Sequence, residues 1–317
     1  MSRSLTLLLP HVPASVQQRL PALETMLARS DRHCALPTSL QQRLLQLANL
    51  TATESDPPLG PLCALGDGLD AGSGYWLCAE PVHLVADQDR LYLAARAESL
   101  AITATEAAAL TAEFNALYRD DGWQLFAPRP AHWYLRLPQP LQVCTTVPDG
   151  AEGCDVWASR PQGHDALRLQ AALNEIQMLF HASAVNGRRR DSGLPAINSL
   201  WLWGGAVMPA LAPLPWQALY GDASLLRGFA ARAGIPCTTA VAEDGAWLQG
   251  TGSSLVLLQD ELLPSDMARF MPLLDALRRG ELVQLDIHLT ATPCSYRLDR
   301  RAARRWWRRR RPLANLI

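Results

Sequence analysis

Strands and helices alternate along the sequence, and this alternation predicts an α/β protein whose mixed sheet is flanked by helices. Short apolar runs bounded by Gly, Pro or Asp are typical of strands, and between them apolar residues recur at helical spacing. Residues 282–289 and 294–298 follow each other closely enough to form an antiparallel hairpin. We therefore expect a mixed sheet and not a purely parallel one.

The first half of the chain begins with an apolar run at residues 5–9. Because this run is too short to cross a membrane and is followed by Pro10, we expect the first strand of a cytoplasmic protein without a membrane span. Glu106 is placed to complete a capping box with Thr103, which marks the start of a helix. Helical spacing is found at residues 15–29, 38–49 and 103–118, and strand patterns at residues 75–79, 82–86, 90–94, 123–126 and 133–137.

A passage at residues 138–163 contains several Pro and Gly residues and one short strand pattern. We therefore predict two lobes, an N-terminal α/β lobe at residues 1–150 and a C-terminal α/β lobe at residues 164–317, with one compact unit as the alternative. In the second lobe, helices are expected at residues 222–233 and 265–279, and a buried strand at residues 254–259.

The composition argues against several classes of enzyme. All 29 basic residues are arginine, so no lysine is available for a phosphate-binding P-loop, a Schiff base or a Ser-Lys dyad. The seven cysteines are scattered and form no C-x-x-C motif, which indicates reduced thiols and not a disulfide scaffold or a zinc ribbon. The motifs of zinc proteases, esterases and dinucleotide-binding enzymes are also missing from the sequence.

Polar and aromatic residues are concentrated at residues 174–205, in an order that packing alone does not require. On a helix, Asn174, Gln177 and His181 fall within an arc of about 60° beside an apolar stripe. A loop with several arginines follows, and then a strand that runs into two glycines. Amide, imidazole and guanidinium groups suit a small anion. The ligand-binding candidates are Asn174, Gln177, His181, Asn186, Arg189, Asn198, Gly204 and Gly205. A satisfied polar network that fixes the helix against the strand is the alternative.

This segment resembles the signature of the RpfE-type regulatory proteins of proteobacteria. In that family a helix with N-E-I-Q-M-L precedes a histidine pair, V-N-x-x-R-E, G-x-P and N-S-L-W-L-W-G-G-G. The matching positions here are 174–179, His181, Val185, Asn186, Arg189, Gly193, Pro195 and 198–205. Ser183, Arg190 and Ala206 stand where the family has its second histidine, its glutamate and its third glycine. Weaker similarity extends over most of the length, including residues 80–84, residues 132–135 and the end rich in Arg and Trp. The resemblance implies a regulatory protein without a settled biochemical activity.

A strand that ends in Gly-Gly and is followed by Leu225-Leu226-Arg227-Gly228 is similar to cofactor-independent phosphoglycerate mutases. This similarity implies an alkaline-phosphatase-like fold and, as an alternative function, a phosphate-ester hydrolase or mutase. Metal-dependent enzymes of that group use several Asp and His ligands around a Ser or Thr nucleophile, and no such cluster is visible in the sequence. We therefore predict no cofactor and no metal site, and expect a divalent metal only if the chain is an enzyme.

The C-terminal end of the chain is strongly basic. Residues 300–311 contain eight arginines and no acid, which leaves 21 arginines against 30 carboxylates in the remainder. Arginines next to tryptophans suit a nucleic acid, an anionic membrane or an acidic protein surface. The residues that would contact a nucleic acid or an acidic partner are Arg304, Arg305, Trp306, Arg308 and Arg309. We favour docking of this end onto the acidic body of its own chain, with the tryptophans buried.

The sequence thus favours a non-catalytic regulatory or ligand-binding protein with a polar site for a small anion. A phosphate-ester hydrolase or mutase is the first alternative. The second alternative is a nucleic-acid-binding regulator that acts through the arginine-rich end.

Overall fold

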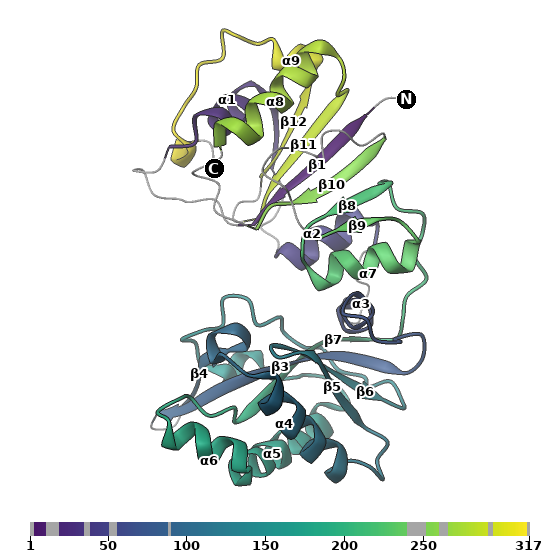
Figure 1. The fold of residues 1–317 in the computed structure, drawn as a ribbon, viewed down its shortest axis with the longest axis vertical. Helices are drawn as coiled ribbons and strands as arrows, with labels where there is room; N and C mark the ends of the chain where they lie inside the picture. The colour runs from purple at the N-terminus through teal and green to yellow at the C-terminus, as the bar shows by residue number, and fades with distance from the viewer. Residues whose placement is uncertain are drawn as a thin grey trace. The chain divides into compact units, whose positions relative to one another are not determined.

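The chain divides into two compact units (Figure 1). Unit 1 is formed by Met1–Leu50 together with Leu211–Ile317, and unit 2 by Thr51–Ala210. This division differs from the predicted one, whose boundary between residues 150 and 164 lies inside unit 2. The computed structural model describes residues 3–10, 19–34, 39–50, 56–87, 90–239, 252–259, 266–290 and 294–315.

Unit 1 contains a seven-stranded mixed sheet in the order β2-β12-β11-β1-β10-β8-β9. Its central strand β1 (Ser4–Leu9) pairs in parallel with β10 (Ser253–Leu257) and with β11 (Gln284–Leu289). β12 (Cys294–Asp299) runs antiparallel to β11 and to β2 (Asp31–Cys34), which confirms the predicted hairpin and the mixed sheet. The remaining strands are β8 (Ala218–Tyr220) and β9 (Cys237–Thr238). Because strands from both chain ends alternate in this sheet, the first and last parts of the chain must fold together.

The helices of unit 1 pack on this sheet through apolar side chains. In Figure 1, α1 and α8 lie side by side, and Leu23 and Phe270 on these helices join Leu7 of β1 in one buried core. The helices are α1 (Pro21–Arg29), α2 (Leu40–Leu47), α7 (Ser224–Ala233), α8 (Asp266–Arg279) and the short α9 (Arg300–Ala303). Residues 11–18, part of which was predicted to belong to the first helix, lie outside the described residues.

Unit 2 is organised around one long strand, β3 (Tyr75–Asp87). Three strands pair antiparallel with it, namely β4 (Arg90–Arg96), β6 (His132–Leu137) and β7 (Ser199–Ala206), and β5 (Gln124–Arg129) pairs with β6. The sequence predicted two separate strands here, at residues 75–79 and 82–86. They form a single strand because β7 pairs with β3 across Pro81.

The sheet of unit 2 has helices on both faces (Figure 1). α3 (Leu59–Gly66) covers one face, and α4 (Ala104–Leu117), α5 (Ala166–Ala182) and α6 (Ala184–Asp191) cover the other. The predicted capping box of Thr103 and Glu106 is confirmed at the start of α4. The predicted loop after α5 was wrong, because the Ser183 hydroxyl accepts a hydrogen bond from the Val185 N–H (3.1 Å) and starts α6.

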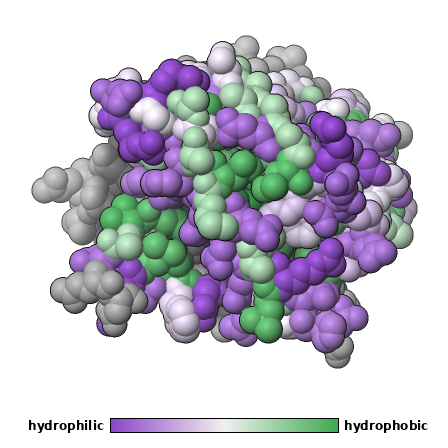
Figure 2. All heavy atoms as spheres, turned by 90° about the horizontal axis from the view of Figure 1, so that it is seen from below, coloured by the Kyte–Doolittle hydropathy of each residue, from purple (hydrophilic) through white to green (hydrophobic). Residues whose placement is uncertain are grey.

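Figure 2 shows one face of the molecule, on which hydrophilic side chains separate several small hydrophobic areas from one another. Separate areas of this kind are normal for a protein surface. None of the helices in the described ranges is both long enough and apolar enough to span a membrane.

Candidate functional site

Asn186 is fully buried in the first turn of α6, where it binds the backbone on both sides. Its Nδ2 donates hydrogen bonds to the carbonyl oxygens of Phe180 (2.7 Å) and Ile197 (2.8 Å), and its Oδ1 accepts one from the Ile197 N–H (2.8 Å). The side chain therefore joins the end of α5 to the residues that lead into β7. Most of its hydrogen-bonding capacity is used by the backbone.

Arg189 is also buried, with 1% of its surface exposed. Its Nε donates to the Pro195 carbonyl (2.7 Å), one Nη donates to the Leu100 carbonyl (2.6 Å), and the other pairs with Glu106 (3.0 Å). Burial opposes the charge on Glu106, but hydrogen bonds from Thr103 and Arg189 outweigh it and lower the pKa of this carboxyl group. The guanidinium group thus has structural partners on each side.

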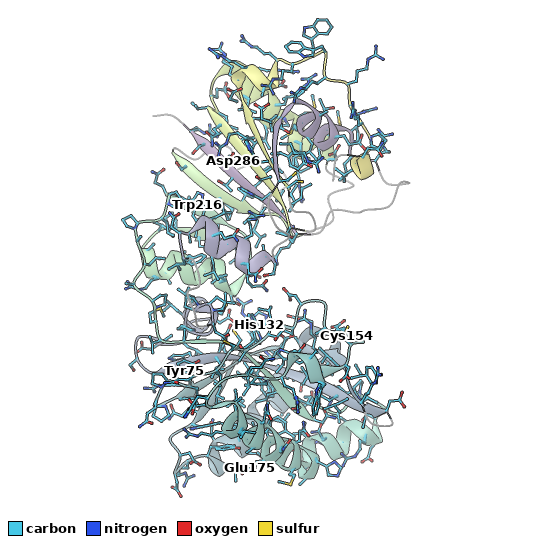
Figure 3. The ribbon with its side chains drawn as sticks, turned by 180° about the vertical axis from the view of Figure 1, so that it is seen from behind. Tyr75, His132, Cys154, Glu175, Trp216 and Asp286 are labelled. Carbon is cyan, nitrogen blue, oxygen red and sulfur yellow. The ribbon has the colours of Figure 1, made fainter. Side chains whose placement is uncertain are left out.

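Asn198 and the two glycines hold the strand β7 in place. The Asn198 side chain accepts from the Leu84 N–H (2.8 Å) and donates to the Leu84 carbonyl (2.7 Å), as a paired strand residue would. A Cβ on Gly204 would lie 2.7 Å from Cβ of Leu59, and one on Gly205 would overlap the hydroxyl of Tyr75, a residue of the sheet labelled in Figure 3. Together with Asn186 and Arg189, these contacts form a polar and packing network that fixes helices α5 and α6 against β7.

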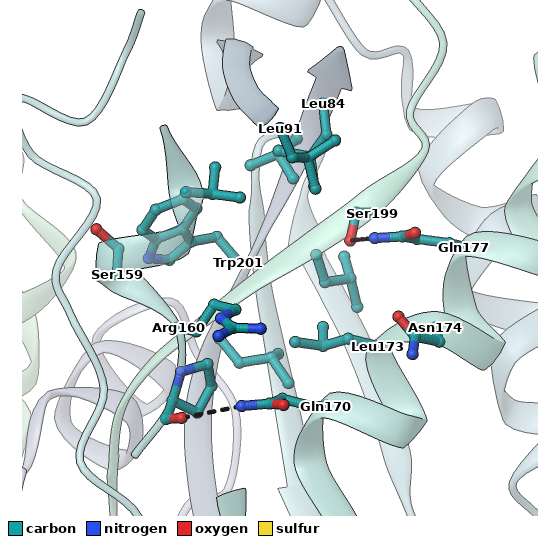
Figure 4. A pocket seen from close by; sticks show the side chains of 15 residues that line it. Leu84, Leu91, Ser159, Arg160, Gln170, Leu173, Asn174, Gln177, Ser199 and Trp201 are labelled. Atoms are coloured by element: carbon teal, nitrogen blue, oxygen red, sulfur yellow. Dashed lines mark hydrogen bonds between the residues drawn. The ribbon is translucent and has the colours of Figure 1, made fainter. Parts of the chain in front are cut away.

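Asn174 and Gln177 instead line a pocket of unit 2 (Figure 4). The pocket lies between α5, β7 and the 3-10 turn η2 (Val156–Ser159) and has a volume of about 200 Å³. Its apolar wall includes Leu84, Leu91, Leu173 and Leu200, and its polar wall includes Arg160, Gln170, Asn174, Gln177 and Ser199. The structure thus brings two of the predicted residues together with three others. His181 is exposed in the last turn of the same helix.

Arg160 supplies the positive charge of this pocket. The carbon of its guanidinium group lies 3.1 Å from the centre of the Trp157 ring, while its buried Nε has no hydrogen-bond partner in the part of the chain that the structure describes. Gln177 donates a long hydrogen bond to the Ser199 hydroxyl (3.4 Å), and Gln170 donates to the Pro161 carbonyl (3.2 Å). A guanidinium N–H without a partner, beside several amides, suits a carboxylate or a phosphate.

Sequence reasoning missed Gln170 and Arg160, for different reasons. Gln170 lies four residues before Asn174 and seven before Gln177, so helical spacing alone could have placed it on the same stripe. Arg160 comes from the Pro- and Gly-containing passage that was predicted to link two lobes, where no periodicity indicates which way a side chain points.

A second polar cluster surrounds Asp67, the residue at the C-terminal end of α3. Its buried carboxylate accepts hydrogen bonds from Nδ1 of His132 (2.9 Å) and from the hydroxyl of Tyr134 (2.6 Å), and Nε2 of His132 faces Glu98 (3.3 Å). Hydrogen bonds with Asp67 and Glu98 raise the pKa of His132 to about 9, so the ring is charged at neutral pH. Asp67 and Glu98 face this charge, Asp67 also pairs with Arg129 (3.5 Å), and the cluster ties α3 to β6.

The arginine-rich end of the chain docks onto unit 1, but its tryptophans remain exposed. Arg305 forms a two-armed ion pair with Asp31, and Arg308 donates to the Ser30 carbonyl (2.7 Å). Trp306 and Trp307 are 79% and 62% exposed. The prediction that these rings are buried was wrong, because buried side chains of the flanking segments, namely Ala302, Ala303 and Leu313, supply the apolar contacts.

Comparison with known proteins shows the fold. No family model matches the sequence, and no curated protein matches it either. The structure is similar to a cofactor-independent phosphoglycerate mutase from Thermoplasma acidophilum, with a TM-score of 0.50 and 14% identity over 94% of this chain and 90% of that chain. It is also similar to the PH0037 protein from Pyrococcus horikoshii, with a TM-score of 0.56 and 14% identity over 93% of this chain and 86% of that chain. The fold is therefore phosphoglycerate-mutase-like, consistent with an alkaline-phosphatase-like fold, and identity this low carries no activity with it.

Clusters of His, Cys, Asp or Glu side chains bind metal ions in proteins. Within the described ranges, no group of three or more of these side chains is arranged to hold a metal ion.

Proposed function

We propose that this chain is a regulatory ligand-binding protein without catalysis, and that its ligand is a small amphiphilic anion held between α5 and β7. The observation that carries this proposal is that Arg160 lines a pocket with leucines on its other wall, while its buried Nε has no hydrogen-bond partner among the described residues. The resemblance of residues 174–205 to the RpfE-type regulatory proteins supports a regulatory role.

The arrangement of the pocket suits an acid with a short apolar chain. Arg160 and the amides of Gln170, Asn174 and Gln177 can bind an anionic head group by charge-assisted hydrogen bonds. The leucines can cover the chain of the ligand, since burial of apolar surface is favourable. Pockets that combine an apolar wall with a few polar groups are typical of small-molecule sites.

Hexanoate is a suitable probe, because Trp201 lines the pocket and Trp157 lies under Arg160, so that tryptophan fluorescence can report binding. We expect hexanoate to change the fluorescence saturably, and the uncharged hexanol to bind at least about tenfold more weakly, because it cannot use the guanidinium group. Arg160→Gln should remove this preference, whereas Arg190→Gln, on the exposed side of α6, should keep it. Equal binding of hexanoate and hexanol by the unmodified protein would refute the proposed anion site.

The phosphoglycerate-mutase-like fold favours a second candidate, a phosphate-ester hydrolase or mutase. This candidate is tested by incubating the protein with 3-phosphoglycerate and with p-nitrophenyl phosphate, each in the presence of Mg²⁺ or Mn²⁺. Under our proposal no turnover above the metal-only blank is expected. An activity that copurifies with the protein and is lost on heat denaturation would refute the ligand-binding proposal. It would show instead that the protein is a hydrolase or mutase.

A further inference from the structure

Unit 1 carries an arginine-lined groove that is separate from the pocket of unit 2. The groove has a volume of about 520 Å³ and lies between the last turn of α1, β2 and the segment after α9. Arg32, Trp307, Arg308, Arg309 and Arg311 line it. This set differs from the one predicted from sequence, since Arg305 is used for docking and Arg32 comes from a distant part of the chain.

Two arginines of this groove are not neutralised within the described chain. Arg309 and Arg311 are exposed, and no acidic side chain in the described ranges forms an ion pair with either of them. The two acids that pair with other arginines of this end have those partners instead, because Asp31 pairs with Arg305, and Glu24 pairs with Arg19 (2.7 Å) and lies 3.7 Å from Arg310. The groove therefore keeps an excess of positive charge.

The other two arginines are held at the wall of the groove by contacts with unit 1. Arg32 donates from Nε (3.2 Å) and Nη2 (3.0 Å) to Sγ of Cys294, and Arg308 donates to the Ser30 carbonyl. The acceptors of these hydrogen bonds are a sulfur atom and a carbonyl oxygen, not carboxylates, so these contacts leave the positive charges of both guanidinium groups in place. Four guanidinium groups thus face one concave surface, an arrangement that attracts a polyanion.

Exposed aromatic rings stand beside these charges. Trp306 and Trp307 contact each other edge to face, with ring centres 6.2 Å apart and an interplanar angle of 86°. Exposed tryptophan next to arginine suits nucleic acid, because the phosphates bind the guanidinium groups and an unpaired base can stack on the indole ring.

We propose that this groove binds single-stranded nucleic acid, with phosphates on Arg309 and Arg311 and a base stacked on Trp307. A duplex fits less well, because its bases are already stacked inside and cannot reach the ring. A membrane also fits less well. Interfacial binding uses the apolar face of an amphipathic helix, whereas the α-helix at this end stops at Ala303, before the tryptophans.

Binding can be measured with the full-length protein and fluorescein-labelled oligothymidylate and oligouridylate of about 12 nucleotides, which is within the site sizes of single-strand binders. The affinity should fall steeply between about 50 and 200 mM salt. Arg309→Gln with Arg311→Gln should lower the magnitude of the slope of log K against log salt by about 1.4, since each phosphate contact contributes about 0.7. Trp307→Ala should weaken binding about tenfold and leave the slope unchanged.

The matched control is the pair Arg188→Gln and Arg190→Gln, which removes the same charge from α6 of unit 2. This control should bind as tightly as the unmodified protein, and thermal melts should show that all variants are folded. Equal loss of binding in the control would mean that total charge is responsible and not the groove.

Two further measurements distinguish single-stranded nucleic acid from a duplex and from a membrane. A DNA duplex of the same length should bind more weakly than the single strands and should not respond to Trp307→Ala. Any binding of the protein to phosphatidylglycerol vesicles should be the same for the unmodified protein and for Trp307→Ala. The proposal is refuted if the single strands do not bind, or if the variants affect only the vesicles.

Discussion

Burial decides which polar residues of the 174–205 segment act as structural groups. Asn186 and His181 are both polar residues of this segment, yet Asn186 is fully buried with three backbone hydrogen bonds and His181 is exposed. A buried backbone group that loses its hydrogen-bond partner destabilises the fold, because water cannot reach it to replace the bond. An exposed side chain can be truncated at little cost, because water replaces its contacts. The two residues should therefore differ sharply when they are truncated.

Asn186→Ala is expected to lower the free energy of unfolding by about 3 kcal/mol, because it removes the partner of the buried Ile197 N–H and carbonyl groups and leaves the Phe180 carbonyl with the Ser183 N–H alone (3.2 Å). His181→Ala should change it by less than about 0.5 kcal/mol. Urea unfolding followed by circular dichroism measures both values. Equal effects of the two substitutions would contradict the structural role of Asn186.

His132 makes stability depend on pH in the mildly alkaline range. Its pKa is raised from 6.5 to about 9 in the folded protein, first by Asp67 and then by Glu98. The folded state holds this proton more tightly than the unfolded state. The stabilisation that protonated His132 provides is therefore complete below pH 6.5 and is lost as the pH rises through 9. The ring is partly exposed, so solvent screening limits the effect to at most about 3 kcal/mol.

We expect the stability difference between the unmodified protein and His132→Gln to shrink as the pH rises from 6.5 to 9. Chemical unfolding at several pH values measures this difference. Met178→Gln, which replaces an exposed side chain that carries no charge, is the control and should leave the pH profile of the unmodified protein unchanged. A constant difference across this range would show that the ring does not carry the charge.

At the level of elements, α8 provides the missing cap of α1. The residue before α1 is Leu20, which has no capping side chain, and the buried Asp266 of α8 accepts hydrogen bonds from the N–H groups of Ala22 (2.8 Å) and Leu23 (3.1 Å). Asp266→Ala should therefore destabilise unit 1 by about 2 kcal/mol, the upper end for loss of a helix cap. Asp275→Ala, on the same helix but with a half-exposed side chain that pairs with Arg278 of its own helix, should have little effect in the same thermal melts. A similar loss from both substitutions would exclude capping as the cause.

The strands β2 and β12 place two cysteines opposite each other. Cys34 and Cys294 are paired in the register, and their Sγ atoms lie 2.7 Å apart. The hydrogen bond with Cys294 and the nearby Arg32 lower the pKa of Cys34, which favours its reactive thiolate form. Oxidised glutathione should therefore convert the two thiols into one intramolecular disulfide and be reduced to two molecules of glutathione.

Mass spectrometry of the alkylated protein should show this oxidation as the loss of two free thiols. Cys34→Ser should abolish it, and Cys154→Ser, which replaces another exposed cysteine, should not. A disulfide that still forms in Cys34→Ser would mean that different cysteines react.

Sequence periodicity predicted individual elements better than the contacts between them. The helical stripe of Asn174 and Gln177, the Thr103 capping box and the C-terminal hairpin each depend on residues close in the sequence, where spacing determines which side chains meet. Arg160 reaches the pocket from a segment without regular structure. Asp67 meets His132 only because α3 ends beside β6, so neither could be predicted from spacing.

At the level of the whole molecule, the order of strands in unit 1 explains why the predicted division at residues 150–164 differs from the observed one. A composition rich in Pro and Gly marks a loop, but it does not reveal whether that loop separates units. The pairing of β1 with β10 and β11 determines the division, and such pairing joins residues about as far apart as the chain allows. Each unit then has its own buried core, with Leu7 in one and Leu77 in the other.

Separate cores predict that damage to one unit leaves the other folded. Leu7→Asp places an unpaired charge in the core of unit 1, at a cost of more than about 4 kcal/mol, and should remove hydrogen-exchange protection from α8 and β11. β3 and β7 of unit 2 should remain protected, because their contacts with each other and with α3 and α5 do not involve that core. Leu77→Asp should give the reverse pattern. Loss of protection in both units after either substitution would mean that the chain unfolds as one cooperative body.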